Sequence, residues 1–179
     1  NYSEFIDKYR LVPLGEWIPS WFNLNGLSAV GGILPGEKSR LLEWSGPPLA
    51  AAICYEISDG NLLAQAVENG AEWILTIANL DPYPILLQNQ FRSLAQLRSI
   101  ETSRELISAA NTGPSIKILS TGEVISVIPP FSKDLGLTKL HSRSQMTAYV
   151  RWREMPIIVL FFISLCKFFE SSFRSSIRH

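Results

Sequence analysis

Apolar runs and amphipathic spacing alternate through residues 49–78 in a way that predicts three consecutive elements. Residues 49–54 form a short continuous apolar run with prolines before it and polar residues after it, which favours a buried strand. Residues 61–69 carry apolar side chains at helical spacing, and Gly70 stands where a C-terminal cap belongs. Residues 73–78 are apolar and partly β-branched, as in a second buried strand. This succession of strand, helix and strand predicts a parallel crossover and an α/β fold.

A longer amphipathic pattern follows and then gives way to short apolar runs. Between residues 87 and 108 an apolar stripe predicts the longest soluble helix; the stripe consists of Phe91, Leu94, Ala95, Leu97, Ile100 and Leu106. We expect strands at 107–110 and 116–119, and a turn at 120–123 that leads into a further strand at 124–128. By contrast, prolines and glycines are so dense in residues 11–48 that we expect short strands and loops there.

The C-terminal tail differs in kind from the rest of the chain. Residues 155–166 are apolar apart from one proline and one serine. Twelve to fifteen apolar residues cover about 22 Å as a helix, compared with a hydrocarbon thickness of about 30 Å. Trp152 precedes the run at an interface-like position, and Lys167 and two arginines follow it, as expected for a cytoplasmic end. We expect residues 151–179 to be a membrane segment with a short basic tail, with a buried terminal element as the alternative.

The composition narrows the class of protein. With 179 residues, 46% hydrophobic and 18% charged, the chain suits one packed domain and is neither disordered nor collagen-like. Sixteen basic and sixteen acidic residues leave no net charge, which argues against nucleic acid as a partner. The two cysteines and two histidines are too scattered in sequence to suggest a zinc site or a disulfide framework.

The beginning of the chain suggests a piece of a longer protein. It starts at Asn1 without a methionine, and its first thirty residues lack the apolar stretch of a signal peptide. If the parent protein is exported, we expect its targeting segment upstream of Asn1.

Cys54 is the candidate nucleophile, because it ends a predicted strand and precedes a predicted helix. There the sulfur would emerge at the C-terminal edge of a sheet, beside helix N–H dipoles that favour the reactive thiolate. A lone free cysteine is nevertheless often buried and inert, and the residue type by itself leaves that alternative open. Cys166 lies in the apolar tail, and we expect it to be inert.

Several short motifs occur in order along the chain. Residues 8–16 read Lys-Tyr-Arg-Leu-Val-Pro-Leu-Gly-Glu, and residues 53–56 read Ile-Cys-Tyr-Glu. An Arg-x-x-Glu pair follows at Arg98 and Glu101, and an Asn-x-Gly turn at residues 111–113. Each motif is weak individually. In this order and at these separations they resemble the apolipoprotein N-acyltransferases of the nitrilase superfamily, over about residues 1–170.

The resemblance implies a triad of glutamate, lysine and cysteine. Cys54 would attack an acyl carbonyl, and Lys8, matching the family's lysine, would stabilise the thiolate and the tetrahedral oxyanion. Glu16 and Glu56 would orient the lysine and the active-site loops, and we group them with the catalytic residues. The alternative for both glutamates is ordinary hydrogen bonding within the scaffold.

Three aromatic residues are the predicted substrate-binding residues. By the resemblance, Tyr55 would pack at the acyl or head-group pocket, and Tyr83 lies in a segment that would border it. Trp17 would either line a concave surface or anchor its loop to the core.

The chain departs from the family's pattern in two ways. The family's base glutamate would lie upstream of Asn1, so we expect this chain to hold two of the three triad members and to be inactive alone. Residues 79–84 read Asn-Leu-Asp-Pro-Tyr-Pro where the family commonly has Asn-Asp-Ala-Trp-Phe. The two prolines would stiffen this segment, so we expect a changed lid over the acyl pocket.

The resemblance also implies an architecture and a reaction. Residues 1–150 would form the C-terminal part of a nitrilase-like α-β-β-α sandwich on the periplasmic face of the inner (cytoplasmic) membrane, followed by a transmembrane helix. The reaction would move a fatty acyl group from a phospholipid, through a thioester on Cys54, to the N-terminal amino group of a diacylglyceryl-cysteine apolipoprotein. The alternatives are a soluble nitrilase or amidase that hydrolyses a small C–N bond, and a catalytically silent domain that binds lipid or lipoprotein. Neither the sequence nor the resemblance suggests a metal or an organic cofactor.

Overall fold

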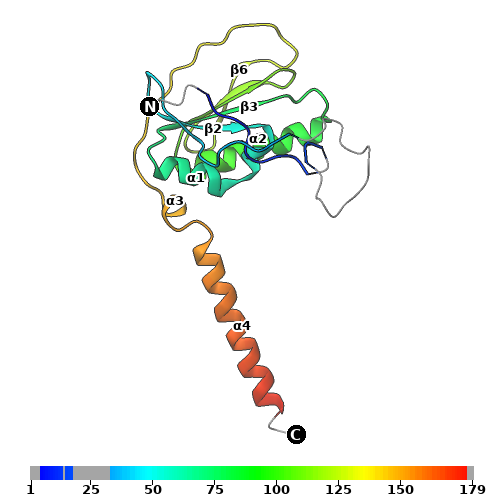
Figure 1. Ribbon diagram of the computed structural model, residues 1–179, viewed down its shortest axis with the longest axis vertical. Coiled ribbons are helices and arrows are strands. Elements are labelled where there is room, and N and C mark those ends of the chain that lie inside the picture. Colours follow the sequence, from blue (N-terminus) through cyan, green and yellow to red (C-terminus); the bar gives the residue numbers. More distant parts are fainter. Residues whose placement is uncertain (1–4, 14, 18–32, 177–179) are drawn as a thin grey trace.

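A six-stranded sheet forms the centre of the molecule (Figure 1). The computed structural model describes residues 5–13, 15–17 and 33–176. The strands follow one another across the sheet in chain order: β1 (Leu41–Leu42), β2 (Leu49–Ile53), β3 (Trp73–Ala78), β4 (Leu106–Ala110), β5 (Ser115–Ile118) and β6 (Val124–Ile128). Strands β2, β3 and β4 run parallel, whereas β1, β5 and β6 join antiparallel. The predicted α/β class, the parallel crossover and the hairpin are therefore confirmed.

The helices are the 3-10 helix η1 (Cys54–Ser58), α1 (Gly60–Glu68), α2 (Ile85–Thr102), α3 (Ala148–Trp152) and α4 (Met155–Ser176). Helix α1 begins where the Asp59 carboxylate accepts a hydrogen bond from the Leu62 amide at 3.2 Å. It ends before Gly70, whose φ of +115° is a backbone conformation that suits glycine. The cap predicted at Gly70 is thus confirmed.

The predicted end of the long helix was wrong. Helix α2 stops at Thr102, because Ser103 adopts a left-handed conformation with φ of 52° and its amide turns back to the Ile100 carbonyl. Leu106, which the helical stripe included, instead begins β4 and pairs with Ile74 of β3.

The main core lies between the sheet and helices α1, α2 and α3, which cover the same face (Figure 1). Because side chains alternate along a strand, Ala50 and Ala52 of β2 join this core while Leu49 and Ala51 point to the opposite face. On that second face a small apolar cluster packs against strand side chains and two extended segments; its members are Leu49, Ala51 and Trp73, with Ile6, Leu42, Leu75, Ile107 and Leu140.

The tail forms helix α4, which projects away from the body of the molecule (Figure 1). Its apolar side chains from Met155 to Phe169 are largely exposed. We expected a transmembrane helix within residues 151–179. Among the described residues, no helix has both the length and the apolar character needed to cross a bilayer, so this expectation is not confirmed.

Candidate active site

The carboxyl ends of three parallel strands meet at one edge of the sheet. The register pairs Ile53 of β2 with Ile77 of β3, and Ala78 of β3 with Ala110 of β4. The residues directly after these strands therefore share the edge at which ligands bind in open α/β sheets. An open cavity of about 650 Å³ lies there, lined by Lys8, Glu16, Ile53, Cys54, Ile77, Ala78, Asn79, Pro82, Tyr83, Ala109 and Asn111.

Cys54 is the first residue of η1, directly after β2, and its backbone is strained. Its φ is 55°, a left-handed conformation that costs a residue with a side chain about 1–2 kcal/mol. Strain of this kind persists where the surrounding structure enforces it, and it occurs often at functional sites. The half-buried free thiol lines the cavity directly after β2, the strand-end position that the sequence predicted.

Lys8 and Glu16 form a tight ion pair at the same cavity. The Lys8 ammonium lies 2.6 Å from both carboxylate oxygens of Glu16, and one of these oxygens also accepts the Val12 amide at 2.8 Å. Although burial raises the pKa of Glu16, the hydrogen bonds from Lys8 and Val12 and the charge of Lys8 outweigh it and hold this pKa below its ordinary value. Glu16 is therefore kept ionised and is suited to fixing the lysine.

Glu56 lies beneath the site, fully buried. One carboxylate oxygen accepts the amides of Tyr9 and Arg10 at 2.6 and 3.0 Å, and the other accepts the amide of Ile53 at 2.8 Å. Its counter-charge is Arg40, whose Nη1 is 3.1 Å from both oxygens. Glu56 thus orients backbone segments, and its position away from the cavity lining sets it apart from Lys8, Glu16 and Cys54.

Tyr83 reaches the Cys54 cavity from the segment 79–84. Burial, the charges of Cys54 and Glu16 and a hydrogen bond with Cys54 together raise the pKa of Tyr83. The same side chain lines an adjoining apolar cavity of about 330 Å³ with Val12, Tyr55, Ser58, Leu87, Gln90, Phe91 and Leu94. Tyr83 therefore stands between the thiol and an apolar space.

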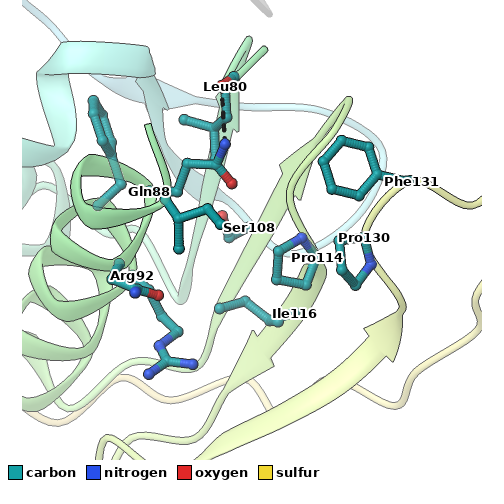
Figure 2. Close-up of a pocket in the computed structure, with 11 residues that line it drawn as sticks. Leu80, Gln88, Arg92, Ser108, Pro114, Ile116, Pro130 and Phe131 are labelled. Atoms are coloured by element: carbon teal, nitrogen blue, oxygen red, sulfur yellow. Dashed lines mark hydrogen bonds between the residues drawn. The ribbon is translucent and has the colours of Figure 1, made fainter. Parts of the chain in front are cut away.

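The segment 79–84 is anchored from both sides. The Asn111 side chain accepts the Leu80 amide at 3.0 Å and donates to Asn79 at 2.7 Å. Gln88 of α2 donates to the carbonyls of Leu80 and Tyr83 at 3.3 and 2.9 Å. Figure 2 shows Gln88 reaching Leu80 at the rim of a further cavity of about 240 Å³ between α2 and β5. These bonds, together with the prolines, fix the segment where we expected a stiffened lid.

The other two aromatic residues lie outside the Cys54 cavity. Tyr55 lines the adjoining apolar cavity and carries the Arg10 guanidinium 5.6 Å from its ring centre. Trp17, about half exposed, lines a separate open cavity with Tyr9, Arg10 and Pro35. Of the three predicted substrate-binding residues, Tyr83 is the one that the described structure brings to the thiol.

Sequence reasoning missed Arg40, which is 1% exposed. It also gave Asn79 no role at the site. Asn79 follows a predicted strand, and that position could have marked it for the same reason that marked Cys54. Arg40 lies in a segment rich in glycine and proline and carries no local signal of burial.

A thiol, an ammonium group and an ionised carboxylate around one cavity suit nucleophilic chemistry at an acyl carbon. The cation can stabilise a thiolate and a developing oxyanion, and the carboxylate holds the cation in place.

Comparison with known proteins gives a consistent result at the level of sequence. The chain is 59% identical over 168 residues to an apolipoprotein N-acyltransferase of Prochlorococcus marinus strain SARG, a match that covers 93% of this chain and 34% of that protein. It is 58% identical over 160 residues to the apolipoprotein N-acyltransferase of Prochlorococcus marinus strain MIT 9313, a match that covers 88% of this chain and 32% of that protein. The chain thus spans about a third of the length of these curated relatives. No family model matches it.

Solved structures show partial likenesses. Nit3 of Saccharomyces cerevisiae, a member of branch 10 of the nitrilase superfamily, aligns with 17% identity and a TM-score of 0.47, covering 52% of this chain and 37% of that one. The NitN amidase from Nesterenkonia sp. AN1 aligns with 19% identity and a TM-score of 0.47, and the alignment covers 69% of this chain and 47% of the amidase chain.

Proposed function

We propose that this chain is the cysteine-bearing part of an enzyme that acylates lipoproteins, because it is 59% and 58% identical to two apolipoprotein N-acyltransferases over about a third of their length. The observation that carries the proposal is the cavity in which the strained Cys54 shares a lining with the Lys8–Glu16 pair.

In the first half-reaction, the Cys54 thiolate attacks the carbonyl carbon of a phospholipid ester. The resulting oxyanion is stabilised by the Lys8 ammonium, which Glu16 holds by two short contacts. Collapse of the intermediate breaks the ester C–O bond and releases a lysophospholipid, whose oxygen takes up the proton that the Cys54 thiol gave up on becoming a thiolate. Cys54 is left as a thioester.

In the second half-reaction, the free amino group of a diacylglyceryl-cysteine attacks the thioester carbonyl. The C–S bond breaks, the amine loses a proton, and an amide forms as Cys54 returns to the thiol. Glu16 is engaged by Lys8 and its pKa is lowered, so it is poorly suited to accept this proton. As the family resemblance implies, we assign the role of proton acceptor to a glutamate outside this chain. This chain alone would then not complete the cycle.

The surrounding surfaces have roles consistent with a lipid substrate. Tyr55 and Tyr83 would contact the acyl chain in the apolar cavity that adjoins the thiol. The exposed apolar side chains of α4 would contact the lipid phase that holds the donor. A second sheet from the rest of the protein would cover the face of the sheet around Leu49 and Trp73, and the catalytic part would lie on the periplasmic face of the inner membrane.

The test is to trap the acyl group on sulfur. The natural full-length protein is incubated with phospholipid vesicles that carry a labelled acyl chain, quenched in acid and digested. We expect the label on the Cys54 peptide, and its release by neutral hydroxylamine as required of a thioester. Cys166→Ser is the matched control and should label normally, whereas Cys54→Ala should not.

Two other outcomes would overturn the proposal. Unchanged lipoprotein acylation by the Cys54→Ala protein as the sole copy in cells would indicate a catalytically silent domain. Hydrolysis of small amides without any dependence on lipid would indicate an amidase.

A further inference from the structure

Arg40 is a fully buried cation that the proposed chemistry does not use. Its side chain and that of its partner Glu56 both have 0% exposure. Taking two charges out of water is costly unless the geometry and the remaining hydrogen bonds compensate. Here nearly every donor is engaged: Nη1 contacts Glu56 and donates to the Asp7 carbonyl at 2.8 Å, Nε donates to Ser39 at 2.9 Å, and Nη2 donates to Glu37.

These bonds join three segments that are far apart in sequence. The Asp7 carbonyl belongs to the residue before Lys8, so Arg40 holds the backbone next to the catalytic ammonium. The segment 36–40 adds a second tie, since the Gly36 amide donates to the Lys8 carbonyl at 2.8 Å. The Arg40 carbonyl in turn accepts the Ala51 amide of β2 at 2.8 Å.

Glu56 completes the connection to the nucleophile. The oxygen that accepts the Tyr9 and Arg10 amides fixes the segment that follows Lys8, and the other oxygen fixes the amide of Ile53, the residue before Cys54. One carboxylate therefore links the segment that carries the ammonium to the strained turn that carries the thiol. Without a cation this carboxylate would be a buried, unpaired charge.

We propose that Arg40 is a positioning residue that, through the Asp7 carbonyl and the Glu56 carboxylate, sets the Lys8 ammonium against the Cys54 thiol. This role rests on the proposed function, because it concerns the same lysine and cysteine. Arginine is required because its planar guanidinium can donate hydrogen bonds to the Glu56 carboxylate and to the backbone carbonyls at the same time. The ammonium of a lysine is a single compact charge and cannot reach all of these acceptors.

The experiment measures the reactivity of the thiol and needs no lipid. In a Cys166→Ser background, so that Cys54 is the remaining thiol, the rate of alkylation by iodoacetamide is followed by mass spectrometry from pH 6 to 9. For Arg40→Met we expect the alkylation rate near neutrality to fall about tenfold, because the ammonium that promotes attack by the sulfur is no longer held in place. For Arg40→Lys we expect a rate between those of Arg40→Met and the background.

Arg104→Met is the matched control. Arg104 is as buried as Arg40 and donates to the carbonyls of Ala71, Thr102 and Gln145, but it lies before β4, at the opposite end of the strand from the Cys54 edge. We expect it to lower the melting temperature while leaving the Cys54 alkylation profile unchanged.

An Arg40→Met chain that folds and alkylates like the background would overturn the proposal, as would an equal slowing in Arg104→Met. If Arg40→Met does not fold, Arg40→Lys decides: an unchanged profile contradicts the positioning role and a slowed one supports it. Failure of the proposed acyl transfer would appear separately, as an unlabelled Cys54 in the lipid experiment with the alkylation effect intact.

Discussion

At the scale of single residues, the backbone of Cys54 is as informative as its sulfur. The residue has a φ of 55°, which glycine adopts readily and other residues adopt at a cost. The turn places the side chain at the end of β2, where it lines the cavity with Lys8 and Glu16. The fold thus tolerates local strain in order to present the thiol.

This strain predicts an inverted preference between glycine and alanine. Cys54→Gly should be more stable to urea than Cys54→Ala by about 1 kcal/mol, because glycine relieves the strained φ. At exposed Asn61 in α1 the order should be reversed: Asn61→Gly should be less stable than Asn61→Ala by about 1 kcal/mol, because glycine disfavours the helix. An equal stability of the two Cys54 variants would contradict the strain.

The Lys8–Glu16 pair predicts a dependence of stability on pH. The folded-state pKa of Glu16 lies below its ordinary value of 4.5, so the ionised form stabilises the fold above about pH 4.5, and this contribution is lost as the pH falls through the folded-state pKa. The difference in unfolding free energy between the natural chain and Glu16→Gln should therefore be constant near neutrality and shrink below about pH 4.5. Urea titrations at a series of pH values measure it. Glu43→Gln, at an exposed position, is the control substitution.

At the scale of elements, three helices meet at the first residue of α1. Gly60 lies against α2 and α3: a Cβ there would fall on the guanidinium of Arg98 and 2.5 Å from the hydroxyl of Tyr149. Arg98 is itself buried and paired with Glu101 at 3.3 Å. The close approach of the helices therefore depends on the absence of a side chain at this position.

Gly60→Ala should consequently destabilise the fold although alanine favours helix. Displacing a buried, ion-paired arginine is an overpacking change that costs about 1–3 kcal/mol, measurable by urea unfolding. Asn61→Ala, one residue later and exposed, should change stability by less than about 0.5 kcal/mol. A Gly60→Ala chain as stable as Asn61→Ala would show that the helices can move apart freely.

At the scale of the whole molecule, apolar surface is unevenly distributed. Helices α1, α2 and α3 bury one face of the sheet. Helix α4 projects from the body (Figure 1), and its apolar side chains are exposed. Contiguous exposed apolar surface of this kind is rare on soluble monomers and marks sites of association.

Association through α4 is therefore expected when the chain is in aqueous buffer. Sedimentation velocity should find the chain in oligomers that mild detergent disperses, and removal of residues 155–179 should give a monomer with the same far-ultraviolet signature for the sheet. A monomeric intact chain without detergent would contradict this expectation. A charged substitution on the body, such as Asn61→Lys, is the control and should leave the oligomers in place.

Local patterning along the chain was enough to predict most of the elements and the candidate nucleophile. The extents of β2, α1 and β3 agree with the hydrophobic pattern to within one residue at each end, because periods of 2 and 3.6 are local properties that neighbouring side chains impose. The position of Cys54 at a strand end followed from the same pattern. The order of the short motifs indicated a resemblance to the apolipoprotein N-acyltransferases, and the curated relatives that match most of this chain carry that name.

The meeting of distant residues, by contrast, emerged from the folded chain. The left-handed Ser103 ended α2 before Leu106, Tyr83 reached the thiol whereas Trp17 did not, and Arg40 became the buried partner of Glu56. None of these outcomes has a local signature, since each depends on strand register and on the crossing of segments tens of residues apart. Which side chain makes such a contact depends on the space and the charges that the neighbouring segments provide. Those segments come together when the chain folds, so the local sequence does not contain this information.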